Sequence, residues 1–61
     1  MNKEQKVEMK ITAEVQLGNA KHYISMVKGC GVFDKGTITD ERLATAISMI
    51  EKAIGEIEHH N

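Results

Sequence analysis

The chain has 61 residues, with eight basic and nine acidic side chains, a formal net charge of −1, one cysteine and no tryptophan. A net charge so close to zero excludes long-range attraction to nucleic acid or to an anionic membrane surface. A chain of this length forms a single small domain, residues 1–61, and on folding alone it buries only about 60% of the surface that it exposes when unfolded. We therefore expect a monomer to be marginally stable.

Small proteins are commonly stabilised by disulfides, by a metal ion or by a partner subunit. The lone Cys30 excludes an intramolecular disulfide. The three histidines lie far from Cys30 in the sequence and no second cysteine is present, so a zinc site with four Cys and His ligands is not expected, nor is any cofactor. Association with further copies of the same chain is the remaining route, and we predict a homo-oligomer.

Membrane insertion and secretion both require apolar segments. No apolar run approaches the roughly 20 residues that cross a bilayer, and the polar residues 1–5 lack the apolar core of a secretory signal. A free thiol suits a reducing compartment. These features predict a cytoplasmic protein without membrane contact.

Residues 7–17 are ambiguous, because their apolar residues occupy every second position. That alternation is typical of a half-buried strand that ends at Gly18. At helical spacing, the same region forms two apolar stripes on nearly opposite sides of a helix. The first stripe contains Val7, Ile11, Val15, Gly18, His22 and Met26, and the second contains Met9, Ala13, Leu17, Ala20, Ile24 and Val27.

The helical interpretation is favoured because the apolar pattern continues at helical spacing as far as Val27. Asn2 and Gln5 form a capping-box start, and Gly29 supplies a C-cap, which predicts a helix from about 3 to 28. A helix with two apolar stripes needs two partners, one within the chain and one from another subunit. A strand over 6–17 remains the alternative.

Residues 29–38 contain three glycines and an Asp34-Lys35-Gly36 turn signal, and they predict a connecting loop. The loop also carries apolar residues, which predict that it folds back over the helix ends; these are Val32, Phe33 and Ile38. It lacks the glycine and lysine spacing of a P-loop.

A second helix is predicted from about 40 to 59. Thr39 is a suitable N-cap, and Asp40 and Glu41 place negative charge where the helix dipole favours it. One apolar stripe follows at spacings of four and three, formed by Leu43, Ile47, Ile50, Ile54 and Ile57. The fold expected is therefore all-α: an antiparallel hairpin of helices about 3–28 and 40–59 in a homo-oligomer.

No catalytic constellation is evident. Cys30 and His22 lie across a predicted helix end without a third group to orient them, and no pair of carboxylates stands out from a solvated helix face. We therefore expect that the protein is not an enzyme and has no catalytic or metal-ligating residue.

Polar and basic residues cluster around the loop and the start of the second helix. Free backbone N–H groups and the positive end of the helix dipole favour an anion at such a place. The sequence thus predicts a site for a small anionic ligand, formed by Tyr23, Lys28, Lys35, Thr37, Thr39 and Arg42.

Residues 46–54, Ala-Ile-Ser-Met-Ile-Glu-Lys-Ala-Ile, resemble the second helix of the phage sponge proteins of the anti-CBASS and anti-Thoeris family, which reads Ala-Leu-Thr-x-Leu-Glu-Glu-Ala-Val. The resemblance implies a short helical hairpin that oligomerises and sequesters a nucleotide immune signal between subunits without cutting it. This chain departs from the family where Gly55, Glu56 and Ile57 replace an aromatic residue and an asparagine, and its loop lacks the proline.

The strand alternative leads to a different class of protein. A strand over 6–17 followed by helices near 19–28 and 40–58 is similar to the ribbon-helix-helix dimers that insert a two-stranded ribbon into the DNA major groove. The loop here is longer, and Glu8 and Glu14 on the outer strand face would repel phosphates. The leading hypothesis is a non-catalytic oligomer that sequesters a nucleotide; the alternatives are a DNA-binding regulator and a protein-binding inhibitor or adaptor.

Overall fold

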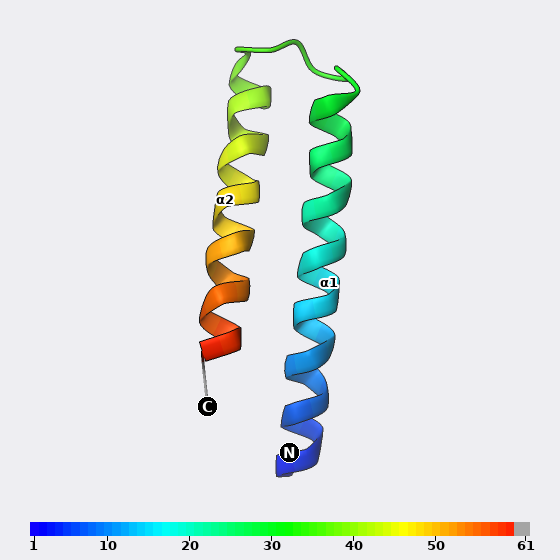
Figure 1. The fold of residues 1–61 in the computed structure, drawn as a ribbon, viewed down its shortest axis with the longest axis vertical. Helices are drawn as coiled ribbons and strands as arrows, with labels where there is room; N and C mark the ends of the chain where they lie inside the picture. The colour runs from blue at the N-terminus through cyan, green and yellow to red at the C-terminus, as the bar shows by residue number, and fades with distance from the viewer. Residues whose placement is uncertain (60–61) are drawn as a thin grey trace.

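The computed structural model describes residues 1–59, which form two α-helices, α1 (Lys3–Gly29) and α2 (Ile38–His59), joined by one loop. The helices lie side by side and run in opposite directions (Figure 1). Together they form a rod of 46 × 16 × 15 Å. The predicted all-α hairpin is confirmed, whereas its assembly with further copies stays a prediction.

The start of α1 is capped as the sequence predicts. The side chain of Asn2 accepts a hydrogen bond from the Gln5 backbone N–H at 2.9 Å, and the Gln5 side chain accepts one from the Asn2 N–H at 3.1 Å. This reciprocal pair satisfies N–H groups that an uncapped helix leaves without partners.

The strand alternative is wrong, because residues 6–17 lie within α1 and no strand occurs between residues 1 and 59. A helix pairs its backbone groups within one segment, whereas a single strand would have needed a second strand beside it. The alternation of apolar residues is compatible with both structures, and the continuation of the pattern to Val27 identified the correct one.

The end of α1 differs from the prediction that Gly29 is the C-cap. The helix includes Gly29, Cys30 is the C-cap, and Gly31 adopts the left-handed conformation with φ of +70°. The Gly31 N–H donates to the Lys28 carbonyl at 3.2 Å, and the Val32 N–H donates to the Val27 carbonyl at 3.4 Å. This is a Schellman motif, which needs a residue without Cβ at position 31 rather than at 29.

The start of α2 also differs, because the N-cap is Thr37 and not the predicted Thr39. The Thr37 Oγ1 accepts from the Asp40 N–H at 3.2 Å, and the Thr37 carbonyl accepts from the Glu41 N–H at 3.0 Å. Thr37 is held in place because its hydroxyl donates to the Asp34 carbonyl at 2.8 Å and Gly36 turns sharply with φ of +83°. The helix therefore begins two residues earlier than predicted.

The loop does not fold back over the helix ends as predicted. Val32 and Ile38 are 64% and 69% exposed. The loop joins the ends of α1 and α2 (Figure 1), and Phe33 is 41% exposed as well. Ile38 is the first residue of α2.

The contact between the helices is formed by half-buried side chains. On α1, these include part of the second apolar stripe: Ala13, Leu17, Ile24 and Val27. On α2, they include the whole predicted stripe: Leu43, Ile47, Ile50, Ile54 and Ile57. No apolar side chain of residues 1–59 is fully buried. Two helices cannot enclose a core by themselves. Each helix of the hairpin therefore shields apolar side chains only on the side that faces the other helix.

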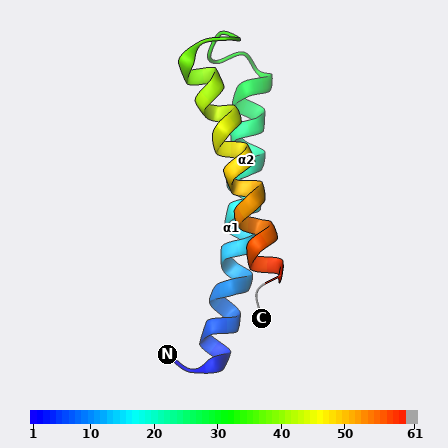
Figure 2. The same cartoon turned by 90° about the vertical axis from the view of Figure 1, so that its left-hand side faces the viewer.

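The first apolar stripe of α1 has no partner within the hairpin. Its large members Val7, Ile11, Val15 and Met26 are between 48% and 57% exposed. We refer to these four residues as the open stripe. α1 also extends past the end of α2, and α2 crosses it obliquely, which leaves the first turns of α1 uncovered (Figure 2). Within the described chain, neither helix has the length and hydropathy that crossing a membrane requires.

Candidate functional site

The loop end of the hairpin contains a polar network around Asp40, which is the one buried polar or charged residue among residues 1–59. The Lys28 Nζ donates to Asp40 Oδ1 at 2.7 Å and approaches the Asp40 carbonyl oxygen at 3.3 Å. The Gly36 N–H donates to the other carboxylate oxygen, Oδ2, at 3.2 Å. One carboxylate thus joins the end of α1, the loop and the first turn of α2.

The surroundings of Asp40 favour its charged form. The hydrogen bond from Lys28, followed by that from the Gly36 N–H, holds the pKa of Asp40 below its ordinary value of 3.8, although its burial acts in the opposite direction. The carboxylate also lies in the first turn of α2, where the helix dipole favours negative charge. The protein's own carboxylate therefore occupies the position at which an external anion was expected.

The six predicted ligand-binding residues fall into two groups. Lys28 and Thr37 take part in the Asp40 network, and their polar atoms bind other parts of the chain. The remaining residues are exposed around the same end of the rod, and these are Tyr23, Lys35, Thr39 and Arg42. The structure thus joins two of the six residues through Asp40.

Sequence reasoning treated Asp40 only as a first-turn acid that suits the helix dipole. The sequence does contain a signal for a capping role, because Thr37 and Asp40 have the spacing of a capping box, S/T-x-x-D/E. The partner Lys28 carries no such signal, because it lies twelve residues earlier and meets Asp40 only when the chain reverses.

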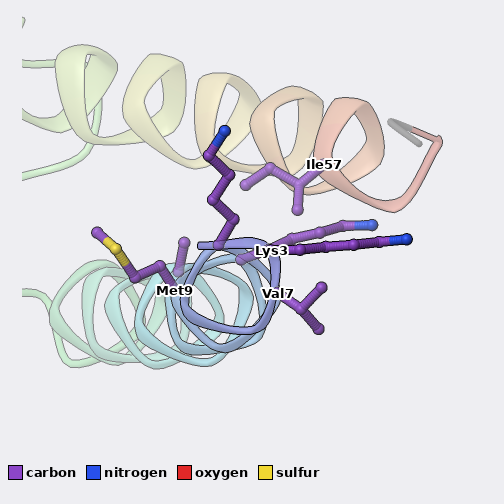
Figure 3. A pocket seen from close by; sticks show the side chains of 7 residues that line it. Lys3, Val7, Met9 and Ile57 are labelled. Carbon is purple, nitrogen blue, oxygen red and sulfur yellow. The ribbon is translucent and has the colours of Figure 1, made fainter. Parts of the chain in front are cut away.

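The open end of the hairpin contains a groove of about 530 Å³ between the first turns of α1 and the last turn of α2 (Figure 3). Its apolar lining is formed by Val7, Met9, Ala13 and Ile57. Its polar lining is formed by Lys3, Lys6 and Lys10. Among residues 1–59, no acidic side chain contributes to the lining, so the described part of the groove combines apolar side chains with lysines.

The groove and the open stripe are neighbouring but different surfaces. Val7 and Met9 project to different sides of α1, and Ile57 points from α2 toward α1 (Figure 3). Val7 belongs to both the open stripe and the groove, whereas Ile11, Val15 and Met26 do not line the groove. A molecule bound in the groove and a helix packed on the stripe would meet only near Val7.

Cys30 is an exposed free thiol, and His22 is exposed as well. Among residues 1–59, no three His, Cys, Asp or Glu side chains come together in a way that would hold a metal ion. No known protein family matches the chain, and neither a curated protein nor a solved structure matches it significantly. The inference of function therefore depends on the surfaces of the hairpin.

Proposed function

We propose that this protein acts by binding and not by catalysis, and that it does so as a homo-oligomer assembled through the open stripe of α1. The observation that carries the proposal is that Val7, Ile11, Val15 and Met26 are about half exposed on one side of a helix whose other apolar side already contacts α2. Large apolar residues that share one side of a helix are expected to face another protein surface.

The energetics of the hairpin support the same proposal. A hairpin with no fully buried apolar side chain has little hydrophobic stabilisation to offset the conformational entropy of its two helices. A second copy packed on the open stripe would give α1 helical neighbours on two sides, as in a four-helix bundle. Apolar surface that is removed from water in that way stabilises the assembly by about 25 cal/mol per Å² of buried area.

For the bound molecule, we propose a small anionic nucleotide held near the loop end between subunits. Lys35 and Arg42 are exposed there and form no ion pair with residues 1–59, while Tyr23 offers an aromatic face that is 67% exposed. The resemblance of residues 46–54 to the phage sponge proteins supports the same class of ligand. Lys28 is excluded from this role, because Asp40 already neutralises it.

The assembly is tested by sedimentation velocity and far-UV circular dichroism over a range of chain concentrations. We expect the unmodified chain to be oligomeric at micromolar concentration, and Ile11→Glu to weaken association by at least about tenfold, since it places a charge in an apolar interface. Gln16→Glu is the matched control, because it adds the same charge at an exposed position of α1 outside the stripe. A monomer that stays fully helical at all concentrations would contradict the proposal.

The ligand is tested by native mass spectrometry with a panel of cyclic and ADP-ribose-type nucleotides, beside a DNA-shift assay. We expect one of the nucleotides to be retained, and Lys35→Glu or Arg42→Glu to abolish its retention. Lys52→Glu, on the exposed face of α2, is the control for net charge. An oligomer that retains no nucleotide rejects the ligand but leaves the assembly standing. A DNA shift would point to DNA binding by the helices, because the ribbon is excluded. Binding of neither nucleotide nor DNA would favour a protein-binding inhibitor or adaptor.

A further inference from the structure

We infer that the groove at the open end binds a single-chain amphiphile that has an anionic head group. This site lies at the opposite end of the rod from the proposed nucleotide site, and its occupant differs in chemistry. The groove brings apolar side chains together with lysines, and no acid among residues 1–59 lines it.

The floor of the groove suits an alkyl chain. Met9 and Val7 lie at opposite edges of the groove on α1, and the apolar stems of the lysines lie between them while their ammonium groups reach water. Ala13 and Ile57 supply further apolar surface. The stretch of α1 from Lys3 to Ala13 is about 15 Å long. A volume of about 530 Å³ lies within the range of small-molecule sites, which are mostly apolar and contain a few polar groups.

The charges of the groove select the head group. Lys3, Lys6 and Lys10 follow one another at spacings of three and four, which places them on one side of α1. Lys3 and Lys6 form no ion pair with residues 1–59, so their charge is available to a ligand. They lie near the positive end of the α1 dipole, which adds to the attraction for an anion.

The size of the groove favours an amphiphile over a protein segment. A stable protein interface involves about 20 residues on each side, whereas seven of the residues that the structure describes line this groove. The second copy proposed above packs on the open stripe, of which only Val7 lines the groove, so it does not fill the groove. The occupant therefore has the dimensions of one alkyl chain with its head group.

The experiment is isothermal titration calorimetry of the full chain with decyl sulfate below its micelle concentration, with neutral decyl maltoside and decyltrimethylammonium in parallel. We expect one decyl sulfate per chain, at least tenfold weaker binding of the neutral compound and no binding of the cation. Octyl sulfate should bind several-fold more weakly than decyl sulfate, because each buried CH₂ changes affinity by up to about fourfold.

Variants locate the site within the hairpin. Lys6→Glu should weaken decyl sulfate binding by at least tenfold, whereas Lys52→Glu, which changes the net charge equally but lies outside the groove, should change it by less than twofold. Acids near a helix N-terminus are favourable, so Lys6→Glu is expected to retain the fold, as circular dichroism will verify. Ala13→Phe keeps every charge and fills the floor, and it should also abolish binding.

Three results would overturn the inference. They are equal affinity for the neutral and the anionic compound, equal weakening by Lys6→Glu and Lys52→Glu, and binding of several decyl sulfate molecules accompanied by loss of the helical signal. The first would show that the lysines do not select the head group, the second that only net charge matters, and the third that the detergent unfolds the chain.

Discussion

The lysine side chains at the two ends of this hairpin have opposite surroundings. At the loop end, the Lys28 ammonium lies 2.7 Å from the Asp40 carboxylate, and the two side chains are only 28% and 12% exposed. At the open end, Lys3 and Lys6 line an apolar groove to which no acid of the described residues 1–59 contributes. The difference shows that the charge of Lys28 is satisfied within the chain, whereas the charges of Lys3 and Lys6 and the apolar open stripe have no partner among residues 1–59.

Removal of the Asp40 carboxylate should have the largest effect on this comparison. Asp40→Ala leaves the half-buried Lys28 ammonium and the Gly36 N–H without their acceptor, and unsatisfied groups of this kind are costly. We expect the melting temperature, followed by circular dichroism at 222 nm, to fall by about 5–10 °C. Asp40→Asn retains an acceptor but not the charge, so its melting temperature should lie between those of the unmodified chain and of Asp40→Ala. An unchanged melting temperature for Asp40→Ala would show that the loop end does not maintain the fold.

Acid should weaken the loop end in a way that depends on Asp40. Because the pKa of Asp40 is lowered in the folded chain, its stabilising effect is fully present above the ordinary value of 3.8 and is lost as the pH falls through the lowered value. We expect urea unfolding to show a loss of stability below pH 4 that is smaller in Asp40→Asn, which cannot titrate at this position. The same acid response in both proteins would assign the loss to other carboxylates.

Two glycines distinguish the loop from the helices. Gly36 has φ of +83°, so Gly36→Ala should lower the free energy of unfolding by about 1–2 kcal/mol. Gly55 lies inside α2, and a Cβ there would meet no atom within 4 Å, so Gly55→Ala should raise the free energy of unfolding by about 0.5–1 kcal/mol. Denaturant unfolding of both variants measures the contrast. An equal change in the free energy of unfolding for both variants would show that stability does not depend on the left-handed conformation of Gly36.

The smallest effect is expected from the second ion pair of the hairpin. Lys21 and Glu51 lie 3.7 Å apart, with side chains that are 42% and 54% exposed. Exposed pairs of this kind contribute about 0.2–1 kcal/mol, so Lys21→Ala should change the free energy of unfolding by less than Asp40→Ala does. A larger loss for Lys21→Ala would mean that the helix contact, and not the loop end, holds the hairpin together.

Most of the fold was predictable from local patterns. The Asn2 and Gln5 capping box and the isoleucine stripe of α2 act over three or four residues, so each could be identified from sequence spacing alone. The errors lay in the two caps beside the loop and in the loop itself, which does not fold back over the helix ends. Thr37 and Thr39 are both acceptable N-caps, as Gly29 and Gly31 are both acceptable at a C-terminus, and the choice depended on hydrogen bonds of the loop.

The candidate site was less predictable. Tyr23, Lys35 and Arg42 are exposed as a ligand site requires, but Lys28 is bound to Asp40. The groove at the open end was not predicted at all, because Ile57 meets Ala13 and Lys6 around one cavity only after the chain has reversed. Residues separated by more than forty positions show no spacing signal that sequence reasoning could use.

The sequence by itself determined the two apolar stripes of residues 7–27 and favoured a helix from about 3 to 28 over a strand, since helical periodicity and capping depend on residues a few positions apart. It did not determine which side contacts α2, because both stripes are apolar and similar in length. Only the tertiary structure decided that the stripe with Leu17 and Ile24 contacts α2 and that Val7, Ile11 and Val15 remain exposed. The physical reason is that the direction in which the loop returns the chain sets the side on which α2 lies.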